Sequence, residues 1–298
     1  MVKADFTGRG IIVPILTPID AAERIDEAKL REQVDFVIEG GVKGILAFGS
    51  NGEFYMVEEE EYARGLSAIL DAARGRVPVY CGLGAISTRK NIRLARMAAY
   101  AGASAVSVLQ PMFIKPTEEE LYQHFQAVAQ AVPELPVLLY NNPARTGYTL
   151  TQALVERLAN TVDNIVGMKD SSGDMTQTEE FIRRNRDCGF RVFCGKDTLI
   201  YTSMCVGAAG CVATTANFVP ELVCSIVDLY EQGRTEEARE AQFKLNPLRL
   251  AMDRGSFPVG TKDLANLAGR DVGLPYRPNM PSAGATLEFM RKVLQEAR

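Results

Sequence analysis

Short apolar runs rich in valine and isoleucine alternate along most of the chain with longer segments in which apolar residues recur at helical spacing. The apolar runs have the length and the bounding turns of strands, and they fall at 10–18, 44–49, 78–84, 105–111, 136–142, 165–170, 191–196 and 210–215. The helical segments lie near 26–40, 57–73, 87–101, 117–132, 149–160, 174–186, 198–206 and 219–231. Continuously apolar strands separated by helices predict a parallel sheet that is covered on both faces. Eight such units favour an α/β fold of the (β/α)8 TIM barrel type, although periodicity alone leaves an open doubly wound sheet as the alternative.

Three further helical patterns follow the eighth unit, within 234–252, 258–269 and 285–297. No low-complexity linker separates them from the rest of the chain. We therefore expect a catalytic barrel over 1–232 and a C-terminal helical extension over 233–298. The extension is expected to pack on the barrel or on a neighbouring subunit.

The composition is that of an ordinary globular protein, with 47% hydrophobic and 23% charged residues among 298. The formal net charge is −4, and no cluster of Lys and Arg indicates a nucleic-acid partner. The apolar runs are too short to span a bilayer, and the N-terminal stretch MVKADFTGRG lacks the apolar core of a secretory signal. We expect a cytoplasmic protein that does not bind a membrane.

A single histidine and the spacing of six cysteines narrow the chemistry. Metal-dependent aldolases and hydrolases need several imidazole ligands, and a Ser-His-Asp triad needs a histidine at the site. His124 lies in an amphipathic helical segment, where a surface or packing role is expected. The cysteine spacings match neither a CxxC redox motif nor paired zinc ligands, so reduced cysteines and a reaction without a metal cofactor are expected.

In a barrel of this type the active site forms at the C-terminal ends of the strands. The polar residues that fall there include Lys169, Tyr140, the turn GSNGE at 49–53 and Arg145. The stretch GAAG at 207–210 precedes a strand, so we expect it at the opposite end, where it allows close packing.

Lys169 ends the apolar run IVGMK, and two interpretations compete for it. A lysine at a strand end commonly extends its amine into water. At the mouth of a barrel, however, apolar neighbours desolvate the amine and disfavour the ammonium form. A neutral amine attacks a ketone to form a Schiff base, which allows an adjacent carbon–carbon bond to form or break without a metal. Tyr140, at the end of the preceding strand, could move the protons that this chemistry requires, or could simply cap the core.

Two further elements could bind carboxylates. The turn GSNGE offers successive backbone N–H groups that suit a small anion, although Gly-rich turns are common. Arg145 follows a proline turn and could bind a second carboxylate through two parallel hydrogen bonds, or could be a solvated loop arginine.

The motifs GSNGE, YNNPARTG and GMKDSSGD, in this order, resemble those of the dihydrodipicolinate synthase/N-acetylneuraminate lyase family, and the resemblance covers nearly the whole chain. It implies that Lys169 forms a Schiff base with pyruvate or another 2-oxo acid, that Tyr140 relays protons, and that the backbone of Ser50 and Asn51 binds the oxo-acid carboxylate. Ser50 is also implied to hydrogen-bond Tyr140, and the backbone of Val212 to line the same pocket. Members of the family are commonly homotetramers built as dimers of dimers, with a covalent lysine imine and no catalytic metal.

The departures from the family pattern concern the aldehyde substrate. The synthases carry a Thr-Thr pair where this chain has Ser50 and Asn51, and a tyrosine where it has Phe113. Arg145 matches the arginine that holds the aldehyde's carboxylate in the synthases, and it disfavours sialic acid as a substrate. The resulting prediction is a class I lyase of the 4-hydroxy-2-oxoglutarate or 2-keto-3-deoxy sugar-acid aldolase type. The alternatives are a 4-hydroxy-tetrahydrodipicolinate synthase acting on pyruvate and aspartate semialdehyde, a 2-keto-3-deoxy sugar-acid dehydratase, and a barrel that binds 2-oxo acids without turnover.

Overall fold

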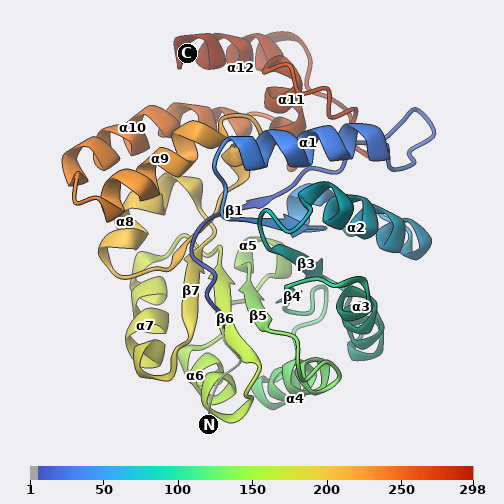
Figure 1. Cartoon of the computed structure of the whole chain (residues 1–298), viewed down its shortest axis with the longest axis vertical. Coiled ribbons are helices and arrows are strands. Elements are labelled where there is room, and N and C mark those ends of the chain that lie inside the picture. The colour runs from blue at the N-terminus through green and yellow to red at the C-terminus, as the bar shows by residue number, and fades with distance from the viewer. Residues whose placement is uncertain (1–5, 298) are drawn as a thin grey trace.

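The computed structural model describes residues 6–297, whose core is a closed barrel of eight parallel strands in chain order (Figure 1). The strands are β1 (Gly10–Pro14), β2 (Gly44–Ala47), β3 (Val79–Leu83), β4 (Ala105–Leu109), β5 (Val137–Asn141), β6 (Ile165–Asp170), β7 (Arg191–Cys194) and β8 (Gly210–Val212). β1 pairs with β8, and this pairing closes the barrel. The predicted TIM barrel is therefore confirmed, and the open sheet is excluded.

A helix follows every strand, as predicted. The helices of the barrel are α1 (Glu27–Glu39), α2 (Glu59–Ala73), α3 (Thr88–Ala101), α4 (Glu118–Gln130), α6 (Gln152–Thr161), α7 (Met175–Asn185), α8 (Ile200–Cys205) and α9 (Pro220–Glu231). A short helical turn that the sequence did not predict, α5 (Pro143–Thr146), comes directly after β5. Two 3-10 turns, Ser50–Gly52 and Thr214–Asn217, follow β2 and β8.

Most strands end earlier than the apolar pattern predicted, because the last apolar residues belong to the loops. The first run is an example: it continues to residue 18 in the sequence, but β1 ends at Pro14. The amide of Leu16 donates to Asn217 Oδ1 at 2.9 Å, and the hydroxyl of Thr17 donates to the carbonyl of Gly52 at 2.8 Å. Hydrogen bonds from the residues that follow β1 thus hold the loops together at the C-terminal end of the barrel.

Successive side chains of a strand point to opposite faces, and this alternation divides the core into two layers. The inner layer fills the barrel with side chains from six strands, namely Ile12, Leu46, Tyr80, Ala105, Phe193 and Val212. The outer layer lies between the strands and the helices, and includes Ile11 and Val13 from the same strand as Ile12. Both layers are apolar, so a polar side chain on the inner face near a strand end is an exception that requires a reason.

The N-terminal end of the barrel is closely packed where β1 meets β8. Gly210, the last residue of the GAAG stretch, has a φ of 154° and pairs with Gly10. A Cβ atom on Gly210 would overlap the backbone of Gly10, so only glycine fits there. The structural role expected for this stretch is confirmed.

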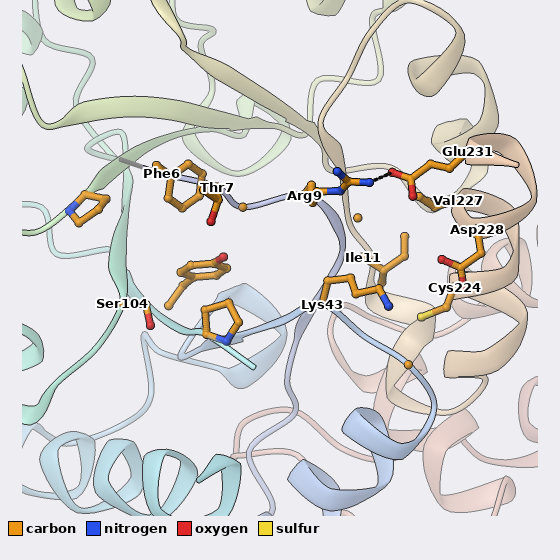
Figure 2. Close-up of a pocket in the computed structure, with 16 residues that line it drawn as sticks. Phe6, Thr7, Arg9, Ile11, Lys43, Ser104, Cys224, Val227, Asp228 and Glu231 are labelled. Atoms are coloured by element: carbon orange, nitrogen blue, oxygen red, sulfur yellow. Dashed lines mark hydrogen bonds and ion pairs between the residues drawn. The ribbon is translucent and has the colours of Figure 1, made fainter. Parts of the chain in front are cut away.

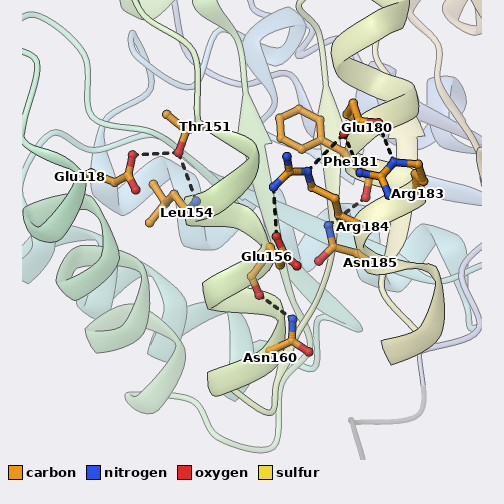
Figure 3. A network of polar contacts seen from close by, with 10 residues as sticks. All are labelled: Glu118, Thr151, Leu154, Glu156, Asn160, Glu180, Phe181, Arg183, Arg184 and Asn185. Atoms are coloured by element: carbon orange, nitrogen blue, oxygen red, sulfur yellow. Dashed lines mark hydrogen bonds and ion pairs between the residues drawn. The ribbon is translucent and has the colours of Figure 1, made fainter.

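Polar contacts connect the outer helices to one another, as Figure 3 shows for α6 and α7. The side chain of Thr151 caps α6 by accepting from the amide of Leu154 at 3.1 Å. Arg184 on α7 bridges Glu156 on α6 and Glu180 on its own helix, with both N–O distances at 3.2 Å. Such exposed pairs stabilise the fold by at most about 1 kcal/mol each, so the apolar layers provide most of the stability.

The predicted C-terminal helices are present as α10 (Thr235–Met252), α11 (Val259–Leu267) and α12 (Gly284–Glu296). They gather on one side of the barrel, with α10 packed against α9 and α8 (Figure 1). The division into a barrel over 1–232 and an extension over 233–298 stays a prediction. Within residues 6–297, no helix has both the length and the apolar character needed to cross a bilayer.

Candidate active site

Lys169 and Tyr140 lie side by side at the C-terminal end of the barrel. They occupy paired positions on the neighbouring strands β6 and β5, and each is only 5% exposed. The Lys169 amine lies 4.3 Å from the centre of the Tyr140 ring. No carboxylate within residues 6–297 forms an ion pair with this amine. The structure therefore brings together the two residues singled out for imine chemistry, and the amine is buried against a phenol.

Hydrogen bonds surround the hydroxyl of Tyr140. The amide group of Asn142 donates to it at 2.8 Å, and the Ser50 hydroxyl lies 3.4 Å away. Burial acts to raise the pKa of Tyr140, but the positive charge of Lys169 and hydrogen bonds from Ser50, Ser171 and Asn142 together bring this pKa below its usual value. The phenol consequently gives up a proton more readily than an isolated tyrosine. Asn142 and Ser171 were not predicted as site residues, although they lie within the motifs YNNPARTG and GMKDSSGD.

The turn after β2 has the shape expected of an anion site. Ser50 and Asn51 begin a 3-10 turn and are both buried, and the first amide groups of such a turn have no partner within it. The turn is closed by Glu53 in the left-handed conformation, with a φ of 52°. Gly52 lies so close to Ile15 that a Cβ atom would come within 3.0 Å of its carbonyl oxygen. The loop therefore presents backbone N–H groups close to Tyr140.

The side chain of Asn51 is engaged on both sides. Its amide nitrogen donates to the hydroxyl of Thr214, after β8, at 2.9 Å. Its amide oxygen accepts from the hydroxyl of Thr261, on α11, at 3.1 Å. Asn51 thus connects the turn to the end of the barrel and to the C-terminal helices, and its backbone remains the part available for a ligand.

A fully buried ion pair holds the other end of the turn. The amine of Lys262, on α11, lies 2.6 Å from a carboxylate oxygen of Glu53, and both side chains are 0% exposed. Lys262 also donates to the carbonyl of Leu274 at 2.8 Å, and Glu53 accepts from the amide of Tyr276 at 3.1 Å. Burial lowers the pKa of Lys262, and the negative charge of Glu53 opposes this change. This pair could not be predicted from the sequence, because Glu53 and Lys262 are distant in the chain.

Of the remaining predicted residues, Val212 lies at the end of β8, buried in the inner layer, and Arg145 lies in α5. The Arg145 side chain is exposed, with its guanidinium carbon 4.2 Å from the centre of the Phe257 ring. Phe113, in the loop after β4, is 89% exposed and has a φ of 78°. Phe257 was not identified from the sequence.

His124 has the packing role expected of it. It is buried in α4, where its Nδ1 atom lies 2.8 Å from the hydroxyl of Thr88. Burial lowers the pKa of this imidazole to about 4. Within residues 6–297, no group of three or more His, Cys, Asp or Glu side chains is arranged to hold a metal ion.

A cavity of about 530 Å³ lies at the opposite end of the barrel, next to the beginnings of the first five strands. Figure 2 shows that the charged side chain of Arg9 in this cavity points at Glu231, with which it forms an ion pair at 2.9 Å. None of the predicted site residues lines the cavity. The predicted site residues and this cavity thus lie at different ends of the barrel.

The sequence and the fold are similar to those of known proteins over nearly the whole chain. The family model described as "Dihydrodipicolinate synthetase family" matches residues 7–297. A 4-hydroxy-tetrahydrodipicolinate synthase from Methanopyrus kandleri is 34% identical over 292 residues, which cover 98% of this chain and 97% of the relative. A protein of the same name from Trichlorobacter lovleyi is 38% identical over 289 residues, with 95% and 98% covered.

Solved structures agree with this result. The crystal structure of dihydrodipicolinate synthase from Thermotoga maritima matches with a TM-score of 0.94 at 30% identity, covering 98% of this chain and 99% of that one. The enzyme from Acinetobacter baumannii, solved in complex with pyruvate, matches with a TM-score of 0.91 at 33% identity, covering 97% and 98%.

Proposed function

Since the chain belongs to the dihydrodipicolinate synthetase family and is a class I aldolase, a carbon–carbon lyase, we propose that Lys169 forms a Schiff base with pyruvate. The enamine derived from this Schiff base would then react with an aldehyde that carries a carboxylate. The observation that carries this proposal is the buried amine of Lys169 against the Tyr140 ring, without a carboxylate partner among residues 6–297. A permanent ion pair would hold the amine as ammonium, which cannot attack a carbonyl.

In the first step, the neutral Lys169 amine adds to the C2 carbonyl of pyruvate. Tyr140 delivers a proton to the departing hydroxyl, water leaves, and a protonated imine remains. A proton is then lost from the C3 methyl group, and the electron pair of that C–H bond moves to form the enamine. The phenolate that Tyr140 becomes after delivering its proton can accept this one, directly or through water.

In the second step, C3 of the enamine attacks the aldehyde carbon, and the aldehyde oxygen takes up a proton. A new carbon–carbon bond and the imine of the product result. Water, or an amine within the product, then attacks the imine and frees Lys169. Each step is reversible, so the same residues also support cleavage.

The pyruvate carboxylate is proposed to bind the backbone N–H groups of Ser50 and Asn51, with the backbone of Val212 lining the pocket. The side-chain contacts of Asn51 to Thr214 and Thr261 support this assignment, because they orient the turn without using its amides. Ser50 would in addition pass a proton to or from Tyr140, which lies 3.4 Å away.

For the aldehyde, we propose L-aspartate 4-semialdehyde, and therefore 4-hydroxy-tetrahydrodipicolinate synthase activity. Relatives of that name, at 34% and 38% identity across nearly the whole chain, support this choice better than the aldolase first favoured from the sequence. Arg145 would hold the carboxylate of the semialdehyde, since its guanidinium is exposed at the same end of the barrel.

A second candidate is a 4-hydroxy-2-oxoglutarate aldolase, whose aldehyde is glyoxylate. Two observations favour it. Asn51 bonds to Thr214 and Thr261 instead of supplying a hydroxyl to Tyr140. Phe113, which has no hydroxyl, stands where the synthases carry a proton-relaying tyrosine.

The test is borohydride reduction in the presence of pyruvate, followed by peptide mass spectrometry. We expect a stable adduct on Lys169 and none in the Lys169→Arg variant. Parallel assays then compare condensation with aspartate semialdehyde and cleavage of 4-hydroxy-2-oxoglutarate. Faster turnover of 4-hydroxy-2-oxoglutarate would favour the aldolase over the synthase. The absence of any adduct with pyruvate or other 2-oxo acids would instead favour a protein that binds 2-oxo acids without turnover.

We also propose that the protein is a homotetramer built from dimers. The apolar side chains of Phe113 and Ile114 are 89% and 70% exposed, which suits contact with a second copy. Sedimentation analysis of the wild type and of Phe113→Lys tests this proposal. The tetramer is expected to dissociate in the variant, and a monomeric wild type would contradict the proposal.

A further inference from the structure

Arg145 carries a positive charge that no acidic side chain within residues 6–297 neutralises by an ion pair. Its guanidinium makes no hydrogen bond to a described residue, and its contact is with the face of the Phe257 ring, 4.2 Å away. Phe257 lies in the connection between α10 and α11 and is 36% exposed. An arginine whose face is covered and whose edge is unpartnered is suited to bind a carboxylate through two N–H groups.

A second arginine of the same chain shows this arrangement in complete form. The guanidinium carbon of Arg157 lies 3.6 Å from the centre of the Tyr122 ring. Its Nη1 atom simultaneously bonds a carboxylate oxygen of Glu119 at 2.6 Å. Stacking on an aromatic face therefore leaves the edge of the guanidinium free to hold a carboxylate. For Arg145, the aromatic ring is present, and the carboxylate would come from the substrate.

The backbone of Arg145 is fixed by the turn that carries it. The amides of Arg145 and Thr146 both donate to the carbonyl of Asn142, at 3.0 and 3.1 Å, and the amide of Gly147 donates to Pro143 at 2.9 Å. This turn directly follows β5, which carries Tyr140. The Cα atom is thus held at the end of the barrel where Lys169 lies, and only the long side chain remains to be oriented.

Tyr55, a second aromatic residue that interacts electrostatically with Arg145, does not neutralise the charge of that arginine. Burial raises the pKa of Tyr55 to about 12, and Arg145 acts against this rise. Tyr55 is therefore a neutral phenol at physiological pH. The nearby carboxylate of Glu53 is already paired with Lys262.

We propose that Phe257 is a positioning residue that aims the guanidinium of Arg145 and thereby makes the site selective for aldehydes that carry a carboxylate. This inference rests on the proposed function. Phe257 can act in this way because α11 is itself fixed to the barrel, through Thr261 to Asn51 and Lys262 to Glu53. The same C-terminal segment thus holds the proposed oxo-acid turn and orients the proposed aldehyde anchor.

The experiment measures KM and kcat with pyruvate and two aldehydes of similar size, glyoxylate and glycolaldehyde, together with aspartate semialdehyde. Removing the ring in Phe257→Leu is expected to raise KM for the two carboxylated aldehydes roughly two- to fivefold, the value of an exposed cation–π contact. The KM for glycolaldehyde, which has no carboxylate, is expected to stay unchanged. Phe257→Tyr, which keeps the ring, is expected to restore the wild-type values.

Two controls separate positioning from a general structural effect. In an Arg145→Ala background, Phe257→Leu is expected to have no further effect on KM, because the two residues act as a unit. Phe289→Leu removes a comparable ring, 40% exposed and 5.0 Å from Arg254, and is expected to leave all KM values unchanged.

An equal rise in KM for all three aldehydes, no rise at all, or a full effect in the Arg145→Ala background would overturn the proposal. Borohydride trapping with pyruvate is run on every variant. A Lys169 adduct in the wild type together with unchanged discrimination in Phe257→Leu would refute the role of Phe257 alone. No adduct in the wild type would refute the proposed function, and this inference with it.

Discussion

Two regions of the molecule bury a lysine, and they treat it differently. At the interface of α11 with the turn after β2, Lys262 lies 2.6 Å from Glu53 and donates to the carbonyl of Leu274. At the end of β6, Lys169 lies against the ring of Tyr140 without an ion-pair partner among residues 6–297. The first amine is held by a charge and a hydrogen bond, and the second has neither. The comparison separates a buried lysine that has a counter-charge from one that has none, and the second is the lysine proposed to form the Schiff base.

The difference follows from the energetics of buried charge. Burial lowers the pKa of Lys262, and the carboxylate of Glu53 compensates part of the cost of burying its charge. Lys169 has no such carboxylate among residues 6–297. Lys262 therefore helps to hold the turn through Glu53, whereas Lys169 is the lysine proposed to react. The contrast can be tested by changing each lysine, and the tyrosine beside Lys169, one at a time.

The largest effect is expected for Lys169→Met. Loss of the imine-forming amine should lower kcat by on the order of a thousandfold or more, as for other covalent nucleophiles. Stability to urea should remain within about 1 kcal/mol of wild type or rise, because no counter-charge is left unpaired. Lys196→Met, just after the neighbouring strand β7, is the matched control and should keep its activity. Retained turnover in Lys169→Met would show that Lys169 does not form the Schiff base.

The opposite result is expected for Lys262→Met. This change leaves Glu53 buried without its partner and should cost about 3–5 kcal/mol of stability, measured by urea denaturation. The double variant Lys262→Met/Glu53→Gln removes both charges and should recover most of the loss. In the absence of urea, the double variant should still form the pyruvate adduct on Lys169. A single variant as stable as wild type would show that the ion pair does not hold the turn.

Tyr140→Phe should affect the reaction without unfolding the protein. Removing the proton-transferring hydroxyl is expected to lower kcat by about a hundredfold or more, within the range of general acid–base catalysis. The buried ring is kept, so the thermal midpoint should change little. Single-turnover mixing with pyruvate would show slower adduct formation, and an unchanged rate would assign the proton transfer to another group.

The smallest effect concerns the ionisation of Tyr140. The charge of Lys169 is one of the causes that lower the pKa of Tyr140 against the effect of burial. Lys169→Met removes that charge and keeps the burial, so the pKa of Tyr140 should rise and the phenolate should appear only at higher pH. Ultraviolet difference titration measures this pKa. The titration curve of the double variant Lys169→Met/Tyr140→Phe is subtracted to remove the signal of the other tyrosines. A downward shift would contradict the electrostatic account.

The sequence predicted the barrel well, because eight apolar runs and the intervening helical periods are local signals. It also predicted that Lys169 and Tyr140 stand at strand ends on the same side of the barrel, because parallel strands end on the same side. The pairing of their positions, Tyr140 with Lys169, is a consequence of sheet register, which the apolar pattern does not contain.

What the sequence did not reveal depends on contacts between distant segments. Lys262 occurs in an ordinary amphipathic helical pattern, and its burial depends on Glu53. Phe257 lies in a connection without periodicity, and its proposed role depends on its contact with the guanidinium of Arg145. The short turn α5 was missed because a proline-containing stretch of four residues carries no helical period.

The contact between Asn51 and Thr261 joins segments 210 positions apart in the chain. During synthesis, the turn proposed to bind the oxo-acid carboxylate leaves the ribosome long before the helix that fixes it, because chains emerge from the N-terminus. A nascent chain that already includes Lys169 therefore still lacks the contact that fixes this turn. The proposed carboxylate site and the proposed nucleophile are therefore complete together only after α11 has been made.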